Sequence, residues 1–169
     1  MQIGMLARMG SVFPFLSDLV HGDLKVYVPA SEEGFFLLAA HIHPHTVYVP
    51  GKEETEKCVR TIEEPLIAEA FASGQEMRGK REWTYGAMLD MYAFPVSREG
   101  RVLAVLVFEV AAEKLSIAGY PHLLAAAHAV MRHAQKARDF SPFDPIQAGD
   151  GILITDAHSR IVFADVAAR

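Results

Sequence analysis

The sequence predicts an α+β fold in which an antiparallel sheet is covered by helices on one face. Apolar and β-branched runs with strand character lie between turn signals, which indicates a sheet of short strands. A long segment nearer the C-terminus has the apolar period of a helix instead. Helices and strands come in groups rather than in the single alternation of a parallel sheet. Of the 169 residues, 51% are hydrophobic, which is enough to build a core.

Residues 3–20 are predicted to be helical, because their apolar side chains recur at spacings of three and four. Gly10 and Pro14 interrupt this period, so we expect either two short helices or one kinked helix.

Two strands follow the helical segment. Leu24–Val28 alternates apolar and polar residues and stops at Pro29, and a stronger strand runs over Phe35–Ile42. Residues 46–49 are expected to be extended between two prolines, and the charged residues 52–57 to form a solvated loop.

A helix over about residues 62–72 is marked at both ends. Thr61 and Glu64 have the spacing of a capping box, Pro65 falls in the first turn, and Gly74 closes the helix. The residues at its start and the glycine at its end therefore both predict this helix.

The second half of the sequence contains the clearest hairpin. Residues 75–85 are expected to be extended, and strands over 89–96 and 102–110 are joined by a turn at 97–100. The last element of the domain is a long helix over about residues 118–138.

One stripe of this long helix recurs at alternating spacings of four and three: Tyr120, Leu124, Ala127, Met131 and Ala134. Such a stripe is typical of a helix that carries a signal or joins two chains, and we expect it to help form a homodimer. The alternative is that the stripe packs on the sheet of its own domain.

Composition narrows the function classes. The net charge of −5 leaves no basic patch to neutralise phosphates, which argues against nucleic acid. The single cysteine, Cys58, has no partner for an internal disulfide and indicates a reducing cytoplasm. No apolar run approaches the length of a transmembrane helix, so no membrane association is expected.

Residues 150–169 read as a strand, a tight turn, a second strand and the start of a helix. This order resembles the first hairpin of a PAS sensor domain, although Asp165 stands where that family usually has Asn. The resemblance implies a first domain over 1–140, a linker over 141–149 and a truncated PAS hairpin over 150–169. Because a two-stranded hairpin alone is marginal in water, we expect this tail to be disordered or to pair with a neighbouring chain.

The hairpin over residues 91–106 resembles a signature of GAF domains, in which Pro95-Val96 and Gly100 flank the turn between two core strands. The segment Ala40–Thr46 and the order of all elements resemble the N-terminal half of cytosolic sensor histidine kinases of the PdtaS and EutW type. The implied fold is a GAF-like antiparallel sheet with flanking helices.

The resemblance also implies a function. The chain is expected to be a signal-sensing module that binds a small ligand or a partner and relays a shift through the long helix to a PAS domain. The implied parent is a cytoplasmic histidine kinase with ATP and Mg²⁺ in its kinase core and a response regulator as partner. Its phospho-accepting and ATP-binding boxes do not occur in this sequence, so the chain itself is expected to have no catalytic residue and no cofactor. The alternative is a ligand-free structural dimerisation module of a PAS-containing cyclase or transcriptional regulator.

Three histidines form the sharpest local cluster of chemistry-bearing residues. His41, His43 and His45 lie at i, i+2 and i+4 of an expected strand, so their imidazoles share a face and are able to converge on one metal ion. Pro44 interrupts that strand, however, and zinc usually draws ligands from more than one segment. The alternative is an edge-strand or loop role, so we expect zinc, copper or nickel to bind weakly at best.

Four aromatic side chains are candidates for a ligand pocket on one face of the sheet: Tyr48, Trp83, Tyr85 and Tyr92. The alternative is that most of them are core aromatics. Cys58 is a candidate for a redox or chromophore-attaching thiol beside Lys57 and Arg60, with a half-buried small residue as the alternative.

Overall fold

A computed structural model of the chain describes residue 6 and residues 9–45, 54–113, 119–136 and 149–164. The strands are β1 (Asp23–Pro29), β2 (Phe35–Ile42), β3 (Lys57–Arg60), β4 (Met77–Thr84), β5 (Ala87–Arg98), β6 (Arg101–Ala111), β7 (Leu153–Thr155) and β8 (Ile161–Ala164). The helices are α2 (Phe13–Val20), the 3₁₀ turn η1 (Thr61–Glu63), α3 (Pro65–Ser73) and α4 (Tyr120–Lys136). Six strands form one antiparallel sheet in the order β3-β2-β1-β6-β5-β4.

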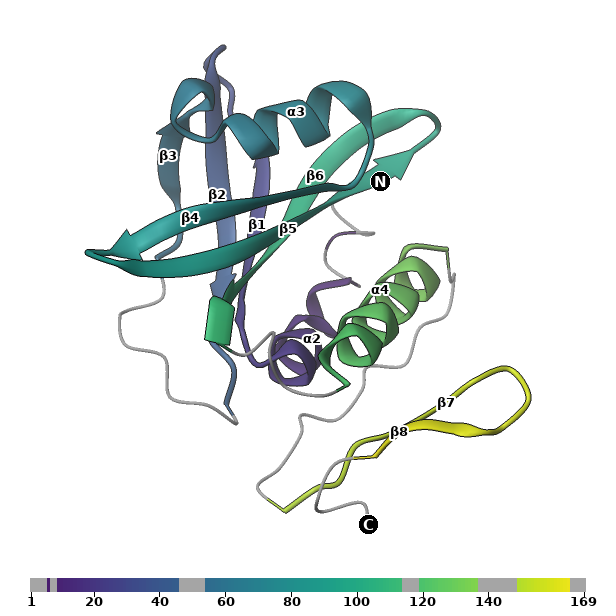
Figure 1. Ribbon diagram of the computed structural model, residues 1–169. Helices are drawn as coiled ribbons and strands as arrows, with labels where there is room; N and C mark the ends of the chain where they lie inside the picture. Colours follow the sequence, from purple (N-terminus) through teal and green to yellow (C-terminus); the bar gives the residue numbers. More distant parts are fainter. Residues whose placement is uncertain (1–5, 7–8, 46–53, 114–118, 137–148, 165–169) are drawn as a thin grey trace.

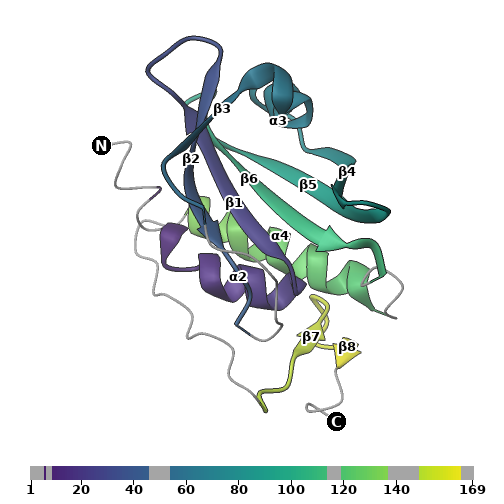
Figure 2. The same ribbon diagram turned by 90° about the vertical axis from the view of Figure 1, so that its left-hand side faces the viewer.

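Helices cover both faces of this sheet (Figure 1). Helices α2 and α4 lie side by side on one face, and α3 lies on the opposite face (Figure 2). The α+β fold predicted from the sequence is confirmed, but the expectation that helices cover one face alone is wrong. The strands carry apolar residues on both of their faces. The sheet therefore has two separate cores, one on each face, and each core is covered by helices.

The central hairpin β5–β6 is confirmed and is longer than predicted. Its turn consists of Glu99 and Gly100, which both have positive φ, at 53° and 78°. Two successive residues of this kind make the turn type whose twist matches that of the flanking strands. Gly100 is therefore needed at the turn for its backbone freedom.

The break predicted within residues 3–20 is confirmed. Met9 and Gly10 are helical, Ser11 begins a turn, and α2 starts at Phe13 with Pro14 in its first turn. The expected extended segment over 46–49 lies outside the described residues.

Strand β3 differs from the prediction, because the residues up to Lys57 were expected to form a loop. Lys57–Arg60 pairs with β2 and forms one edge of the sheet. Cys58 is exposed on this edge rather than half-buried before a helix. The cap also differs from the prediction, since the side chain of Glu63 accepts a hydrogen bond from the backbone N–H of Arg60. Pro65 and Gly74 do begin and close α3 as predicted.

The predicted stripe of α4 faces the interior of its own domain. All five of its residues are buried in the core that α4 shares with α2 and the sheet. Tyr120 also donates a hydrogen bond from its hydroxyl to the backbone carbonyl of Val20, at 2.9 Å, which ties α4 to α2.

Strands β7 and β8 form a separate two-stranded hairpin that packs against the same core. Ile152, Ile154 and Phe163 contact this core, whereas Leu153 and Ile161 are exposed. The expectation of a disordered tail therefore differs from the structure, because the apolar inner face of the hairpin is covered by the preceding domain. Most of the expected linker, 141–148, lies outside the described residues.

Candidate functional site

One half of the sheet face that carries α3 is polar. Lys25 pairs with Val107, which belongs to the apolar core beneath α3, and paired residues of an antiparallel sheet share a face. By the same register Asp23 and Glu109 lie on this face one pair further along, and His41 lies beside Lys25. Apolar residues thus fill this face under α3, and charged residues fill its other end.

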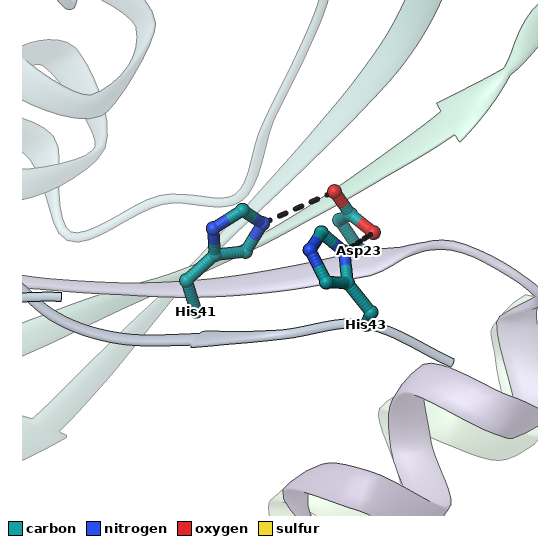
Figure 3. A group of neighbouring side chains, drawn as sticks. All are labelled: Asp23, His41 and His43. Carbon is teal, nitrogen blue, oxygen red and sulfur yellow. Dashed lines mark hydrogen bonds and ion pairs between the residues drawn. The ribbon is translucent and has the colours of Figure 1, made fainter. Parts of the chain in front are cut away.

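Asp23 joins two of the three predicted histidines (Figure 3). Its Oδ2 atom lies 3.1 Å from Nε2 of His41, and its Oδ1 atom lies 2.8 Å from Nδ1 of His43. One ligand atom from each of the three residues falls within 4.8 Å of the other two. Two adjacent strands, β1 and the end of β2, therefore bring a carboxylate and two imidazoles to one point.

The hydrogen bonds fix how these groups are protonated. The backbone N–H of Glu54 donates to Nδ1 of His41 at 3.0 Å, so this nitrogen carries no proton and Nε2 donates to Asp23. Burial raises the pKa of Asp23, but the hydrogen bonds from His41 and His43 outweigh it, and the pKa lies below its ordinary value. Asp23 is thus a carboxylate at neutral pH that accepts from both rings.

His45 lies outside this cluster. Its ring is 63% exposed, and its Nδ1 atom lies 3.4 Å from Oδ2 of the buried Asp18. Its backbone N–H donates to the other carboxylate oxygen of Asp18. The proline between His43 and His45 ends the alternation, which is why the third histidine does not share the face of the first two.

A charged network lies next to the Asp23 cluster on the same face. Glu109 is 5% exposed, and its two oxygens lie 2.6 Å from Nζ of Lys25 and 3.2 Å from Nη1 of Arg81. Arg81 also pairs with Glu64 at the start of α3. Two carboxylates and two cations balance here, so the network links β1, β6, β4 and α3 without net charge.

Burial shapes the ionisation of this network. Burial and the nearby Glu109 raise the pKa of Glu64, although Arg81 opposes the rise. Burial also raises the pKa of Tyr27, and Glu64 and Glu109 add to the effect. Burial lowers the pKa of Arg81, but the two carboxylates outweigh it and the net direction is upward.

The four predicted aromatic residues do not meet in the described part of the chain. Tyr85 is fully exposed at the tip of the β4–β5 hairpin, and Trp83 is half exposed close to it. Tyr92 is buried in the core on the α4 side, with the guanidinium of Arg78 over its ring. Tyr48 lies outside the described residues.

A shallow cleft of about 300 Å³ lies between α4 and the start of β4. Its polar wall contains Glu76, Arg132 and His128, and the ring of His128 lies 4.8 Å from that of Phe94. Nε2 of His128 is 2.6 Å from a carboxylate oxygen of Glu76. Burial lowers the pKa of His128, Arg132 and Arg78 lower it further, and Glu76 opposes them.

The sequence model of the GAF domain of the histidine kinase PdtaS matches residues 1–118. The chain belongs to this family. No curated protein matches the chain in sequence. No helix of the described residues is long and apolar enough to cross a membrane.

Solved structures show the same fold. The sensor region of a sensor histidine kinase aligns with a TM-score of 0.64 and 19% identity, over 96% of this chain and 59% of that one. The chain therefore spans less than two thirds of that sensor region. An IclR homolog from Microbacterium hydrocarbonoxydans, complexed with 4-hydroxybenzoate, aligns with a TM-score of 0.53 and 12% identity, over 80% of this chain and 70% of that one. An IclR family transcriptional regulator from Brucella abortus aligns with a TM-score of 0.52 and 8% identity, over 78% of this chain and 62% of that one.

Sequence reasoning missed the acidic partners of this site. Asp23 lies one residue before the predicted strand Leu24–Val28, and Glu64 was predicted only as part of a capping box. Glu109 did carry a signal, because a lone carboxylate within the apolar run of β6 requires a buried cation. The period of two in β2 did find His41 and His43.

Proposed function

We propose that this GAF domain is the input module of a cytoplasmic sensor histidine kinase and that its polar sheet face receives the signal. The observation that carries the proposal is the family match over residues 1–118, together with the likeness of fold to a histidine kinase sensor region. The proposed signal is a small ligand or a partner protein. The IclR homolog complexed with 4-hydroxybenzoate supports the small-ligand form, because that protein of similar fold binds a small molecule.

The architecture supports a relay from the polar face to the segment after α4. Asp23 and Lys25 of β1 face the polar site, while Leu24 and Val26, which alternate with them, face the core that contains α4. A displacement of β1 therefore moves side chains on both faces of the sheet. Helix α4 in turn contacts β7, so we infer that a shift passes through α4 into the hairpin and the PAS domain that it begins.

The parent protein is proposed to hold ATP and Mg²⁺ in a kinase core, to act on a response regulator and to work as a homodimer. Because the predicted stripe of α4 is buried within one chain, the dimer contact is proposed to use the exposed face of the helix, at Ala125 and Ala129.

The test is phosphoryl transfer by the full-length protein and by the 169-residue chain with Mg²⁺ and labelled ATP. The full-length protein is expected to phosphorylate itself, and the chain alone is expected to show no transfer above the blank. A full-length protein without autophosphorylation would refute the kinase assignment and favour the alternative parent, a cyclase or a transcriptional regulator. Transfer by the chain alone would refute its role as a non-catalytic input module.

A further inference from the structure

We propose that Asp23, His41 and His43 form a binding site for one divalent transition metal ion, with Zn²⁺ as the best match. The three residues come from two separate segments, β1 and the end of β2 with the residue that follows it, which meets the requirement that ligands be drawn from more than one segment. The ligand set differs from the three histidines that the sequence suggested, because the structure replaces His45 with Asp23. The inference does not depend on the kinase assignment, since an ion binds this site or fails to bind it in the chain alone.

The donor atoms select the class of ion. Two imidazole nitrogens with one carboxylate oxygen form the ligand set of zinc sites that keep a fourth position open. Mg²⁺ and Ca²⁺ favour oxygen ligands throughout, so they fit this set poorly. His41 is buried, and Asp23 and His43 are partly buried, which leaves the site accessible from one side.

The distances lie close to those of a bound ion. With bonds of about 2.0–2.1 Å, two ligands of one zinc ion lie no more than about 4.2 Å apart. The carboxylate oxygens already satisfy this limit, at 3.1 Å from His41 and 2.8 Å from His43. All three ligand atoms lie within 4.8 Å, so small rotations of the two rings complete the site.

The charge around the site permits a cation. Asp23 is negative and sits between two rings that are able to act as neutral ligands. The nearest cation on β1 is Lys25, and Glu109 compensates it at 2.6 Å. Arg81 is likewise paired with Glu64 and Glu109. An incoming ion therefore meets one uncompensated carboxylate rather than an excess of positive charge.

Metal binding changes one further contact. A zinc ion on Nε2 of His41 moves the ring proton to Nδ1, and the backbone N–H of Glu54 then loses its acceptor. The imidazole stays neutral, and the proton is transferred within the ring. Binding therefore releases the hydrogen bond between β2 and Glu54, which gives the site a structural readout that a passive hydrogen-bonded cluster lacks.

The first experiment is calorimetric titration of the full 169-residue chain with Zn²⁺. We expect one ion per chain with a dissociation constant below about 10 μM, and a loss of at least about tenfold in affinity for His43→Ala. The matched control is His45→Ala, which removes a histidine two residues away and is expected to retain wild-type affinity. Wild-type binding weaker than about 10 μM, or an equal loss in both variants, would overturn the proposal.

A second measurement keeps the proposal testable if His43→Ala does not fold. Nitrogen NMR of the wild-type chain reports which ring nitrogen of each histidine carries the proton. Zn²⁺ is expected to shift Nε2 of His41 and Nδ1 of His43 to metal-bound values and to leave His45 unchanged. Shifts confined to His45 and other exposed histidines would overturn the proposed ligand set.

Discussion

Phe163 of β8 lies directly on Gly119, the residue before α4. A Cβ atom at position 119 would come within 2.3 Å of Cδ2 of the Phe163 ring, so glycine alone permits this close approach. The φ of Gly119 is +91°, a conformation that other residues rarely adopt. The hairpin that resembles the beginning of a PAS domain is thus seated on the start of the long helix.

Gly119→Ala is expected to detach the hairpin. The added methyl group displaces Phe163, so hydrogen exchange at amides 153–155 and 161–164 should accelerate by about tenfold or more, which corresponds to about 1.4 kcal/mol of local stability. Gly149→Ala is the matched control, because φ is +100° there and no atom lies within 4 Å of the added Cβ. Equal exchange in both variants would show that backbone strain, rather than the contact with Phe163, governs the hairpin.

Glu109→Gln is expected to destabilise the domain by about 3 kcal/mol, because it leaves the partly buried Lys25 and Arg81 without their shared carboxylate. Urea denaturation measures this change. The control is Glu63→Gln, which removes an exposed pair with Arg60 and should cost less than about 1 kcal/mol. A loss for Glu109→Gln no larger than for the control would contradict a stabilising role of the network.

His128 is expected to make the domain less stable as the pH falls. The pKa of His128 is lowered in the folded chain, so the unfolded chain takes up its proton first. The contribution of His128 to the free energy of unfolding is fully present above the pKa of the unfolded chain, about 6.5. It is lost as the pH falls through the lower pKa of the folded chain. Between pH 7.5 and pH 5, the free energy of unfolding should therefore fall less for His128→Asn than for the wild type.

The control for this titration is His122→Asn, an exposed histidine of the same helix. The free energy of unfolding should fall more between pH 7.5 and pH 5 for this control than for His128→Asn. Identical pH dependence of wild type and His128→Asn would show that His128 contributes nothing to acid sensitivity.

Leu124→Glu is expected to unfold the domain rather than to separate a dimer. The side chain is buried in the core between α4 and the sheet, so a carboxylate there should cost more than about 3 kcal/mol. His122→Glu, at an exposed position of the same helix outside the proposed dimer contact, should change the unfolding free energy by less than about 0.5 kcal/mol. Circular dichroism with urea measures both, and a stable, folded Leu124→Glu chain would contradict the packing of α4.

Much of the fold could be predicted because its signals are local. The hairpin β5–β6 is indicated by an apolar and aromatic run, a valine-rich run and the turn residues Glu99-Gly100 between them. Helix α4 keeps an apolar period over its whole length, and Pro65 and Gly74 mark the ends of α3. None of these features requires knowledge of a distant partner.

Strand β3 could not be predicted for the opposite reason. Its four residues are mostly exposed and polar, and only pairing with Phe35–Leu38 of β2 makes them a strand. The two-sided covering of the sheet was missed because apolar residues on both faces of β6 were read as strand propensity alone.

The candidate site could be predicted only in part. His41 and His43 share a face by the period of two, which is a local property of β2. Asp23 joins them through the register between β1 and β2, and Arg81 joins Glu64 and Glu109 through contacts between β4, α3 and β6. Register of this kind is set by the whole sheet and cannot be read from a single segment.

The most direct test of the account is autophosphorylation of the full-length protein with Phe163→Ala, compared with Val162→Ala. Phe163 contacts the core at Gly119, whereas its neighbour Val162 is 39% exposed. If the signal leaves the GAF domain through α4 and this hairpin, Phe163→Ala should change the rate by about fivefold or more, while Val162→Ala stays near the wild-type rate. Melting curves confirm that both proteins are folded. A folded Phe163→Ala protein with the wild-type rate would contradict the relay.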